Sequence, residues 1–224
     1  MCGTVSCIAW SSKSPLKLTN SWNLFIYRLW STIYDGVFDR YFASRGRRRA
    51  LEVLNLQPGE RVLLMGIGTG ADMPLLPEGI WANGIDLSQE MLERANAKLS
   101  LLKCEVALIR GDAQYLPLHK DVFDCAILNL ILSVVPNSAA CLQETMRAVK
   151  PGGRIVIFDK FLPDDGRLTL SRRLLNQITM FFGTDITRRL LDIMTGISCI
   201  KTHDEPSLLN GAYRIILLKK LHSG

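Results

Sequence analysis

Along residues 61–160, short apolar runs alternate with segments that favour helices. The runs that predict strands are 61–65, 81–87, 104–110, 122–130 and 154–160. The run at 122–130, VFDCAILNL, is apolar almost throughout, as expected of a strand that is buried on both faces. Ser88 is a favourable N-cap for the helix after the second run, and a helix over 137–149 is predicted to stop at the turn Lys150-Pro151-Gly152-Gly153. Repeated strand–helix units of this kind predict a parallel, doubly wound α/β sheet.

The C-terminal part of the chain breaks this alternation. Helical stretches at 167–182 and 184–194 precede two strand-like runs at 198–205 and 212–220, which are joined only by PSLLNG. Because two strands so close in sequence favour a hairpin, we expect the sheet to end in an antiparallel edge. The predicted fold is therefore a doubly wound, mostly parallel seven-stranded sheet with an antiparallel C-terminal hairpin.

The segment before the first strand has a different pattern. Its apolar residues recur at steps of three and four, which predicts an amphipathic helix that breaks near Gly36. These apolar residues are Trp22, Phe25, Ile26, Leu29, Trp30, Ile33 and Val37. A second helix at about 44–55 carries a cluster of arginines. We therefore divide the chain into a loose arm at 1–20, amphipathic helices at 21–55 and one α/β domain at 56–224.

Composition narrows the setting in which the protein works. Apolar residues make up 48% of the chain and charged residues 21%, which is typical of a globular protein. The six cysteines form no C-x-x-C pair and the three histidines are not near them at ligand spacing, so we expect free thiols in a reducing compartment and no metal site. Only Met1 precedes Cys2, and the longest apolar run, 125–135, is too short to cross a bilayer. We therefore expect a soluble protein without a secretory signal.

A glycine-rich loop follows the first predicted strand, in VLLMGIGTGADMP at 62–74. Glycines at 66, 68 and 70 let the bare backbone approach a ligand, and the N-terminus of a helix after the loop would add hydrogen-bond donors. With Ala71 the loop satisfies the dinucleotide fingerprint G-x-G-x-x-G/A. It equally satisfies the GxGxG loop that holds S-adenosylmethionine (SAM), so the loop by itself leaves both nucleotides open.

Three polar residues follow the next strands in order. Asp86 ends the second run, 20 residues after Gly66, where a carboxylate can accept hydrogen bonds from ribose hydroxyls; it could instead be a helix-entry acid. Asp112 follows the third run and suits an adenine amino group or an ordinary turn. Asn129 leaves the fourth run, where it faces the departing methyl group or is a satisfied buried amide. Because ligands bind at the carboxyl ends of strands in open α/β sheets, the set favours a SAM site.

Four segments resemble the successive motifs of class I SAM-dependent methyltransferases: VLLMGIGTG, GIDLSQEML, GDAQYLPLHKDVFDCAILN and VKPGGRIVIFD. The resemblance covers about 45–160 and implies a Rossmann-like methyltransferase domain over 56–224, with SAM as cofactor and S-adenosylhomocysteine as product. The cofactor-binding residues that it implies are Gly66, Ile67, Gly68, Gly70, Asp72, Asp86, Leu87, Met91, Asp112, Ala113 and Asn129.

Within that superfamily, LSVVPNSAACLQETMRAVKPGG and DEPSLLNGAYRIILLKK are most similar to the peripheral type of bacterial phosphatidylethanolamine N-methyltransferases. YDGVF fits that group and also the quinone-ring C-methyltransferases. By analogy Tyr34 and Asp35 lie over the cofactor or the substrate amine, and with Asn129 they are the candidate catalytic residues. Tyr34, Asp35 or His119 could act as a general base, although solvent could also take the proton of an amine. Methylation of phosphatidylethanolamine is the preferred function; the alternatives are a quinone precursor as acceptor or a non-catalytic nucleotide-binding protein.

The resemblance also implies a location. Family members use the N-terminal helix to sit on an anionic membrane and to cover the SAM pocket, and the aromatic face of 21–42 with its basic flank suits that role. The same face could instead pack on the sheet. The net charge of +6 fits solvated helix faces, an anionic membrane surface or nucleic acid, and charge alone does not decide between them. With the resemblance taken into account, we expect no nucleic-acid partner. The predicted location is therefore cytoplasmic and peripherally membrane-associated.

The first strand departs from the family pattern at Leu64, where Asp or Glu commonly helps to hold the loop and the ammonium group of the methionine moiety. We expect either weaker SAM affinity or a partial replacement of that acid by Asp72, two residues after Gly70.

Overall fold

A computed structural model describes residues 19, 43–162, 176, 179, 184–208 and 211–222. Several predictions lie outside these residues. One is the amphipathic helix over 21–42, with Tyr34 and Asp35. The others are the arm at 1–20, of which only Thr19 is described, and the helical stretch at 167–182, of which only Asn176 and Thr179 are described.

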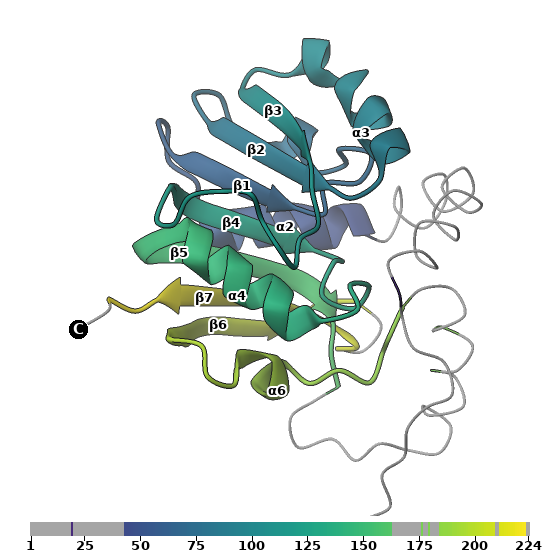
Figure 1. The fold of residues 1–224 in the computed structure, drawn as a ribbon, viewed down its shortest axis with the longest axis vertical. Coiled ribbons are helices and arrows are strands. Elements are labelled where there is room, and N and C mark those ends of the chain that lie inside the picture. The colour runs from purple at the N-terminus through teal and green to yellow at the C-terminus, as the bar shows by residue number, and fades with distance from the viewer. Residues whose placement is uncertain are drawn as a thin grey trace, which may run out of the picture.

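Seven strands form one sheet in the described part of the chain, in the order β3-β2-β1-β4-β5-β7-β6 (Figure 1). The strands are β1 Arg61–Met65, β2 Trp81–Asp86, β3 Glu105–Arg110, β4 Phe123–Asn129, β5 Val149–Lys160, β6 Cys199–Pro206 and β7 Tyr213–Lys220. β1 to β5 pair in parallel, whereas β7 runs antiparallel to both β5 and β6. The predicted doubly wound sheet with its antiparallel C-terminal hairpin is confirmed.

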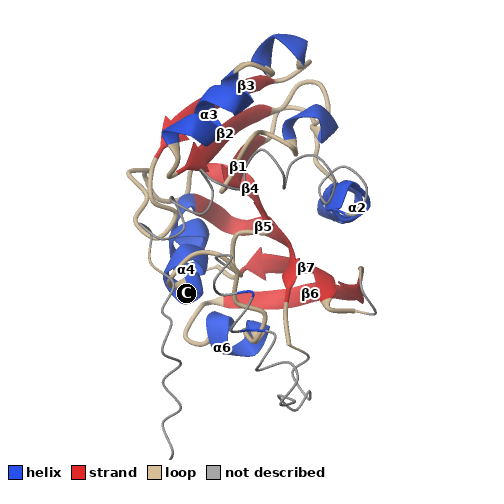
Figure 2. Ribbon diagram, turned by 90° about the vertical axis from the view of Figure 1, so that its right-hand side faces the viewer, coloured by secondary structure: helices blue, strands red, loops and turns tan. Residues whose placement is uncertain are grey.

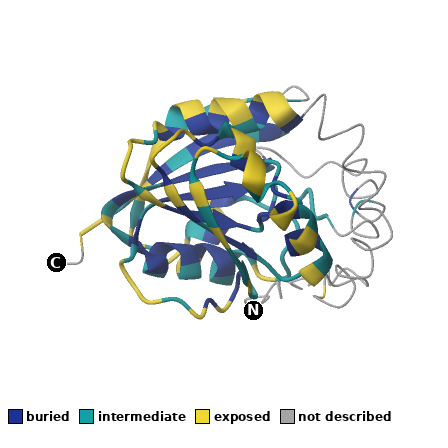
Figure 3. Cartoon of the chain, turned by 90° about the horizontal axis from the view of Figure 1, so that it is seen from above, coloured by how far each residue is buried: buried dark blue, intermediate teal, exposed yellow. Residues whose placement is uncertain are grey.

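Helices cover both faces of this sheet, and Figure 2 shows α2 and α4 on opposite sides of it. The helices are α2 Ser44–Leu54, α3 Gln89–Asn96, α4 Ser138–Ala148 and α6 Leu190–Met194, with short 3-10 turns η2 Met73–Leu75 and η3 Leu99–Leu101. Residues of α2 and α3 share one core cluster with Leu64, while α4 and α6 share the other with Leu63. Because successive strand residues point to opposite faces, neighbours in β1 enter different cores. The central strands β1 and β4 are accordingly mostly buried (Figure 3), whereas β3 and β6 contain no buried residue.

An N-cap residue and a glycine determine where α3 begins and how closely α2 packs on the sheet. The Ser88 side chain accepts a hydrogen bond from the Met91 N–H at 3.3 Å, which confirms the predicted N-cap of α3. In α2, a Cβ on Gly46 would lie 2.2 Å from Cζ of Phe158 in β5, so only glycine allows α2 to pack this closely on the sheet. α2 is thereby held against the strands that carry the candidate site.

Three element predictions were wrong for reasons that lie outside local sequence. The turn expected at 150–153 is instead part of β5, because Val149 already pairs with Phe123 before a register shift. The expected helix stop is present, since α4 ends at Ala148. The helix expected over 184–194 is reduced to α6, because the Asp185 N–H donates to the Ser133 carbonyl and the Asp185 carboxylate accepts from Thr187. No long helix starts directly after the glycine loop; the short turn η2 stands there, so the expected helix N-terminus is missing.

Candidate functional site

The glycine loop joins β1 to η2 and has a left-handed backbone at each of its three glycines. Their φ angles are +65° at Gly66, +56° at Gly68 and +77° at Gly70. A Cβ at Gly66 would lie 2.5 Å from Ile131 and one at Gly70 would lie 2.3 Å from Met73, whereas at Gly68 it would meet none of the described residues within 4 Å. Gly66 and Gly70 are therefore required for packing as well as for φ. Gly68 borders open space, where a ligand can approach the backbone.

Asp86, at the carboxyl end of β2, is bonded directly to this loop. One carboxylate oxygen accepts the Gly68 N–H at 2.8 Å and the other accepts the Ser88 N–H at 2.9 Å. Burial raises the pKa of Asp86, and hydrogen bonds from the backbone of Ser88, Gly68 and Leu87 oppose that rise. A carboxylate has about four acceptor positions, so oxygen lone pairs remain for a ligand hydroxyl. Asp86 thus both stiffens the loop and offers an acceptor beside the open position at Gly68.

Asp112 lies in a turn after β3. Its Oδ1 accepts hydrogen bonds from the backbone N–H and the side-chain amide of Gln114, both at 2.9 Å, as in an Asx turn. The Gln114 side-chain carbonyl in turn accepts the Asn137 N–H at 2.8 Å, which ties this turn to the start of α4. The turn role considered for Asp112 is therefore present, and it leaves a binding role open. Of the other predicted cofactor residues, Ala113 and Met91 are buried and Leu87 is half-buried.

Asp72 and Asn129 meet in a second group on the α2 side of the sheet. Both oxygens of Asp72 lie 3.0 Å from Nη1 of Arg47 in α2, and Oδ1 also accepts from Asn129 Nδ2 at 2.8 Å. Asp72 and Asn129 are each only 4% exposed. We expected Asp72 as a partner of the cofactor, but Arg47 was not among the predicted site residues. The signal that could have found Arg47 is its position between the small buried residues Gly46 and Ala50.

Asn129 keeps one polar atom without a partner. A carboxylate can only accept hydrogen bonds, so the amide must turn its NH₂ group toward Asp72. Its Oδ1 is then left buried and has no hydrogen-bond partner among the described residues. Leaving a buried acceptor unpaired costs about 1–3 kcal/mol. Only half of the satisfied-amide interpretation is therefore correct: the donor is satisfied, and the acceptor is available for an N–H or O–H group.

Leu64, which stands where relatives commonly carry an acid, belongs to the apolar core. It is 1% exposed and pairs with Gly84 of β2 and Ile127 of β4. No polar group replaces the acid at that position. The nearest carboxylate in sequence after the loop, Asp72, is engaged by Arg47 and Asn129.

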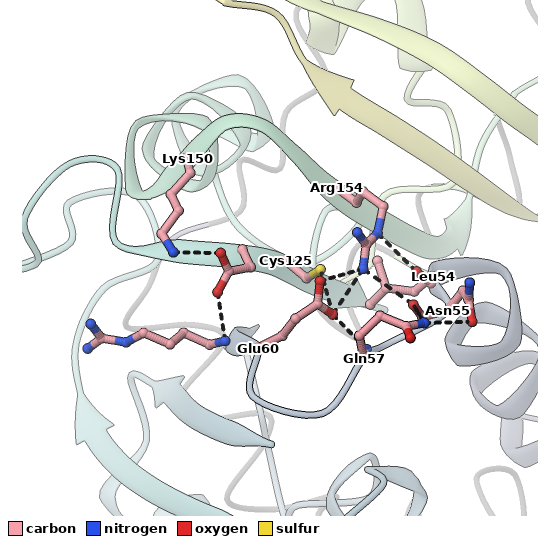
Figure 4. A network of polar contacts seen from close by, with 9 residues as sticks. Leu54, Asn55, Gln57, Glu60, Cys125, Lys150 and Arg154 are labelled. Carbon is pink, nitrogen blue, oxygen red and sulfur yellow. Dashed lines mark hydrogen bonds and ion pairs between the residues drawn. The ribbon is translucent and has the colours of Figure 1, made fainter. Parts of the chain in front are cut away.

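Two further polar residues lie outside this group: Asp124 is near the amino end of β4, and His119 is on the surface. Asp124, near the start of β4, accepts hydrogen bonds from the Arg61 N–H and from Lys150 Nζ, which gives it a structural role at the other end of the strands. Figure 4 shows Lys150 and the network around Glu60 and Arg154 at that end. His119 is exposed in the loop before β4. Within the described ranges, no helix has the length and apolar character needed to cross a bilayer.

Comparisons with known proteins agree with this architecture. Residues 63–157 match the methyltransferase domain family. Phosphatidylethanolamine N-methyltransferase of Cereibacter sphaeroides is 37% identical over 144 residues, which cover 63% of this chain and 70% of that protein. Demethylmenaquinone methyltransferase of Mycobacterium tuberculosis is 33% identical over 138 residues, which cover 61% of this chain and only 55% of that protein.

Solved structures share the fold. A SAM-dependent methyltransferase of Thermotoga maritima superposes with a TM-score of 0.64 at 23% identity, over 88% of this chain and 99% of that one. A SAM-dependent methyltransferase of Methanosarcina mazei superposes with a TM-score of 0.61 at 20% identity, over 77% of this chain and 98% of that one. The fold agrees with the match to the methyltransferase domain family and with the 37% identity to the Cereibacter sphaeroides enzyme, and the chain belongs to the class I SAM-dependent methyltransferases. The open backbone at Gly68 and the free acceptor capacity of Asp86 fit SAM as the methyl donor.

Proposed function

We propose that this enzyme transfers methyl groups from SAM to the amine of a membrane lipid, with phosphatidylethanolamine and its partly methylated derivatives as acceptors. The observation that carries the choice of an amine is the buried, unpaired Oδ1 of Asn129 at the carboxyl end of β4. The likeness to the phosphatidylethanolamine N-methyltransferase supports the choice of lipid.

In this proposal the cofactor binds at the carboxyl ends of β1 to β3, beside the glycine loop. The backbone at Gly66, Ile67, Gly68 and Gly70 would receive the methionine part, and Asp86 the ribose hydroxyls. Leu87, Met91, Asp112 and Ala113 would surround the adenine. SAM brings its own leaving group, so the chain has to align the acceptor and exclude water rather than activate the donor.

Asn129 favours an amine over a ring carbon for a chemical reason. An amine must be uncharged when it attacks, and an amide oxygen can hold the remaining N–H of a primary or secondary amine by a hydrogen bond while solvent takes the proton. A dimethylated amine has no N–H once it is uncharged, so this role of Asn129 applies to the first two methyl transfers. A carbon acceptor requires a base that removes a proton from an activating hydroxyl group, and an amide is no such base. Asp72, the neighbouring carboxylate, already accepts hydrogen bonds from Arg47 and Asn129. Tyr34 and Asp35 remain proposed neighbours of the acceptor.

Membrane association is a further part of the proposal. The arginine cluster of α2 divides into different roles: Arg47 faces Asp72, Arg49 pairs with Glu205 at 2.8 Å, and Arg45 and Arg48 are exposed. The exposed pair would face anionic lipid beside the aromatic segment 21–42. We expect a Trp22/Trp30 double alanine variant to lose vesicle binding in a flotation assay while retaining SAM affinity. Trp81→Ala, at a tryptophan that is 56% exposed, is the matched control and should float like the wild type.

The substrate is tested directly with SAM labelled in its methyl group. The purified chain is incubated with vesicles that contain phosphatidylethanolamine and, in parallel, with a demethylated quinol in neutral vesicles. We expect label in the extracted phospholipid and none in the quinone fraction. Label in the quinone fraction alone would overturn the proposal. Calorimetric titration with SAM and with NAD checks the cofactor, and binding of NAD without SAM would overturn that assignment.

A further inference from the structure

Lys160, the last residue of β5, lies one strand away from Asn129 on the same face of the sheet. β4 and β5 are neighbours (Figure 1), with Asn129 paired to Phe158. Lys160 is two residues beyond Phe158 and therefore shares its face, which is the one that α2 covers. With a rise of about 3.3 Å per residue and about 4.8 Å between strands, the two backbone positions are roughly 8 Å apart. Both side chains thus reach the same region at the carboxyl edge.

The ammonium group of Lys160 has an aromatic neighbour and no direct ion pair among the described residues, although the charge of adjacent Asp159 opposes the lowering of its pKa by burial. Its Nζ lies 5.4 Å from the ring centroid of Tyr213, the residue paired with Lys160 across β5 and β7. Among the described residues no ion pair of Lys160 is present, and adjacent Asp159 accepts the backbone N–H groups of Ser133 and Lys160 instead.

Two arginines near this end of the sheet are paired with carboxylates. Arg47 pairs with Asp72 at 3.0 Å and Arg214 pairs with Asp204 at 2.7 Å. Burial lowers the pKa of Lys160, because its half-buried ammonium is poorly solvated. An anion that binds beside Lys160 would compensate for that lost solvation. A lysine without a direct ion pair, one strand away from a buried acceptor without a hydrogen-bond partner among the described residues, is therefore the distinguishing property of this face.

We propose that this face binds a phosphoamine headgroup at two points, with Asn129 Oδ1 accepting from the amine and Lys160 Nζ donating to the phosphate. An amine and a phosphate joined by a two-carbon spacer present a donor and an anion a few ångströms apart, so such a headgroup could span from Asn129 on β4 to Lys160 on β5. This inference rests on the proposed function and adds how the enzyme would select a phospholipid over an uncharged acceptor. Arg47 and Asp72 are positioning residues in this site, because they fix which side of the Asn129 amide is free.

The test uses soluble probes, because a charge change in vesicle assays would also alter membrane attraction. Glycerophosphoethanolamine, ethanolamine and inorganic phosphate are titrated by calorimetry into the wild type saturated with S-adenosylhomocysteine. Three variants are compared: Lys160→Met, which keeps an unbranched chain on Tyr213; Lys160→Arg, which keeps the charge; and Lys219→Met. Lys219 is the matched control, since it is an exposed lysine of β7 at the opposite end of the sheet, where its backbone lies opposite Arg154 of β5 in the strand register.

We expect Lys160→Met to weaken glycerophosphoethanolamine binding about tenfold or more, as for loss of a charge-assisted hydrogen bond. Ethanolamine binding should stay unchanged, Lys160→Arg should bind nearly like the wild type, and Lys219→Met should be indistinguishable from it. Unchanged glycerophosphoethanolamine binding in Lys160→Met would overturn the inference. Inorganic phosphate binding as tightly as glycerophosphoethanolamine would overturn it too, since Lys160 would then be a simple anion site.

The outcome separates this inference from the proposed function. If phosphatidylethanolamine is methylated but Lys160→Met binds the headgroup normally, only the two-point site is wrong. If Lys160→Met loses headgroup binding but the wild type methylates no lipid, the site is correct and the proposed reaction is wrong. Equal affinity of Lys160→Met and wild type for S-adenosylhomocysteine confirms that the variant has folded.

Discussion

The two ends of the parallel strands hold their polar residues in opposite ways. At the amino ends of β1, β4 and β5, Glu60 accepts from Arg154 at 2.8 and 2.9 Å and from the Gln57 N–H, and Asp124 accepts from Lys150 and Arg61 (Figure 4). At the carboxyl ends, the glycine loop has left-handed backbone, Asn129 Oδ1 has no partner in the described part of the chain, and Lys160 faces an aromatic ring.

The difference separates groups that stabilise the fold from groups that are held ready for ligands. A satisfied network needs nothing from outside the chain, whereas an unpaired buried acceptor costs free energy that a ligand can recover. Hydrogen-bonded aspartates occur at both ends, including Asp86 and Asp72 at the carboxyl ends. The carboxyl ends differ in that they also hold Asn129 Oδ1, a buried acceptor without a partner among the described residues.

The largest effect should come from Asp86→Ala. Loss of a hydrogen bond between the ribose and a charged group costs about 1.5–3 kcal/mol, so SAM affinity measured by calorimetry should fall about tenfold to a hundredfold. Asp124→Ala removes an aspartate from the other end of the strands, where it also accepts a backbone N–H. It should lower the free energy of unfolding and leave SAM affinity unchanged. Equal SAM affinity in both variants would show that the ribose site is wrongly assigned.

Asn129→Leu should separate turnover from stability. The variant removes the unpaired Oδ1 together with the hydrogen bond to Asp72, two changes that oppose each other, so the free energy of unfolding should move by less than about 1 kcal/mol. Methyl transfer to the amine should fall about tenfold or more, since the acceptor loses its hydrogen bond. Either SAM or the acceptor amine could donate an N–H to Oδ1. Calorimetric titration with SAM shows which of the two does, because only a contact with SAM would change SAM affinity. Lost SAM affinity would assign Oδ1 to the cofactor.

Glu60→Gln, at the amino ends of the strands, should lower stability without changing turnover. The side chains of Glu60 and Arg154 are 15% and 32% exposed, so solvent screens part of their attraction. We expect a loss of about 1–2 kcal/mol in the free energy of unfolding, measured by urea denaturation, with kcat unchanged. A large change in kcat at unchanged stability would contradict the division between the two ends.

The smallest effect is expected from Asp72→Ala, which tests whether this residue replaces the acid absent at Leu64. We expect SAM affinity to fall a few-fold, because the Asp72 carboxylate would no longer support the loop or the methionine ammonium. Arg47→Met, which removes the ion-pair partner but keeps the carboxylate, is the control. Intact SAM affinity in Asp72→Ala would reject the replacement and leave Asp72 only its hydrogen bonds to Arg47 and Asn129.

Most of the sheet and the order of the site residues were predictable from the sequence. Strand β1 occupies the predicted 61–65, and Ser88 caps α3, because apolar patterning and capping are decided by neighbouring residues. The placement of Asp86 and Asn129 at carboxyl ends follows from the alternation of strands and helices.

What escaped prediction depends on contacts distant in sequence. Asp72 meets Asn129 57 positions away, and Arg47 reaches Asp72 only because Gly46 lets α2 approach Phe158. The early start of β5 depends on pairing with Phe123, and the shortened α6 depends on a hydrogen bond between Asp185 and Ser133. No local pattern contains these partners.

The most direct test of the account is methyl transfer to phosphatidylethanolamine vesicles by the wild type and by Asn129→Leu, measured side by side at saturating labelled SAM. The account predicts labelled phospholipid from the wild type and about tenfold less or lower from Asn129→Leu, with equal SAM affinity in both proteins. Equal labelling of the lipid by both proteins, or none by the wild type, would contradict it.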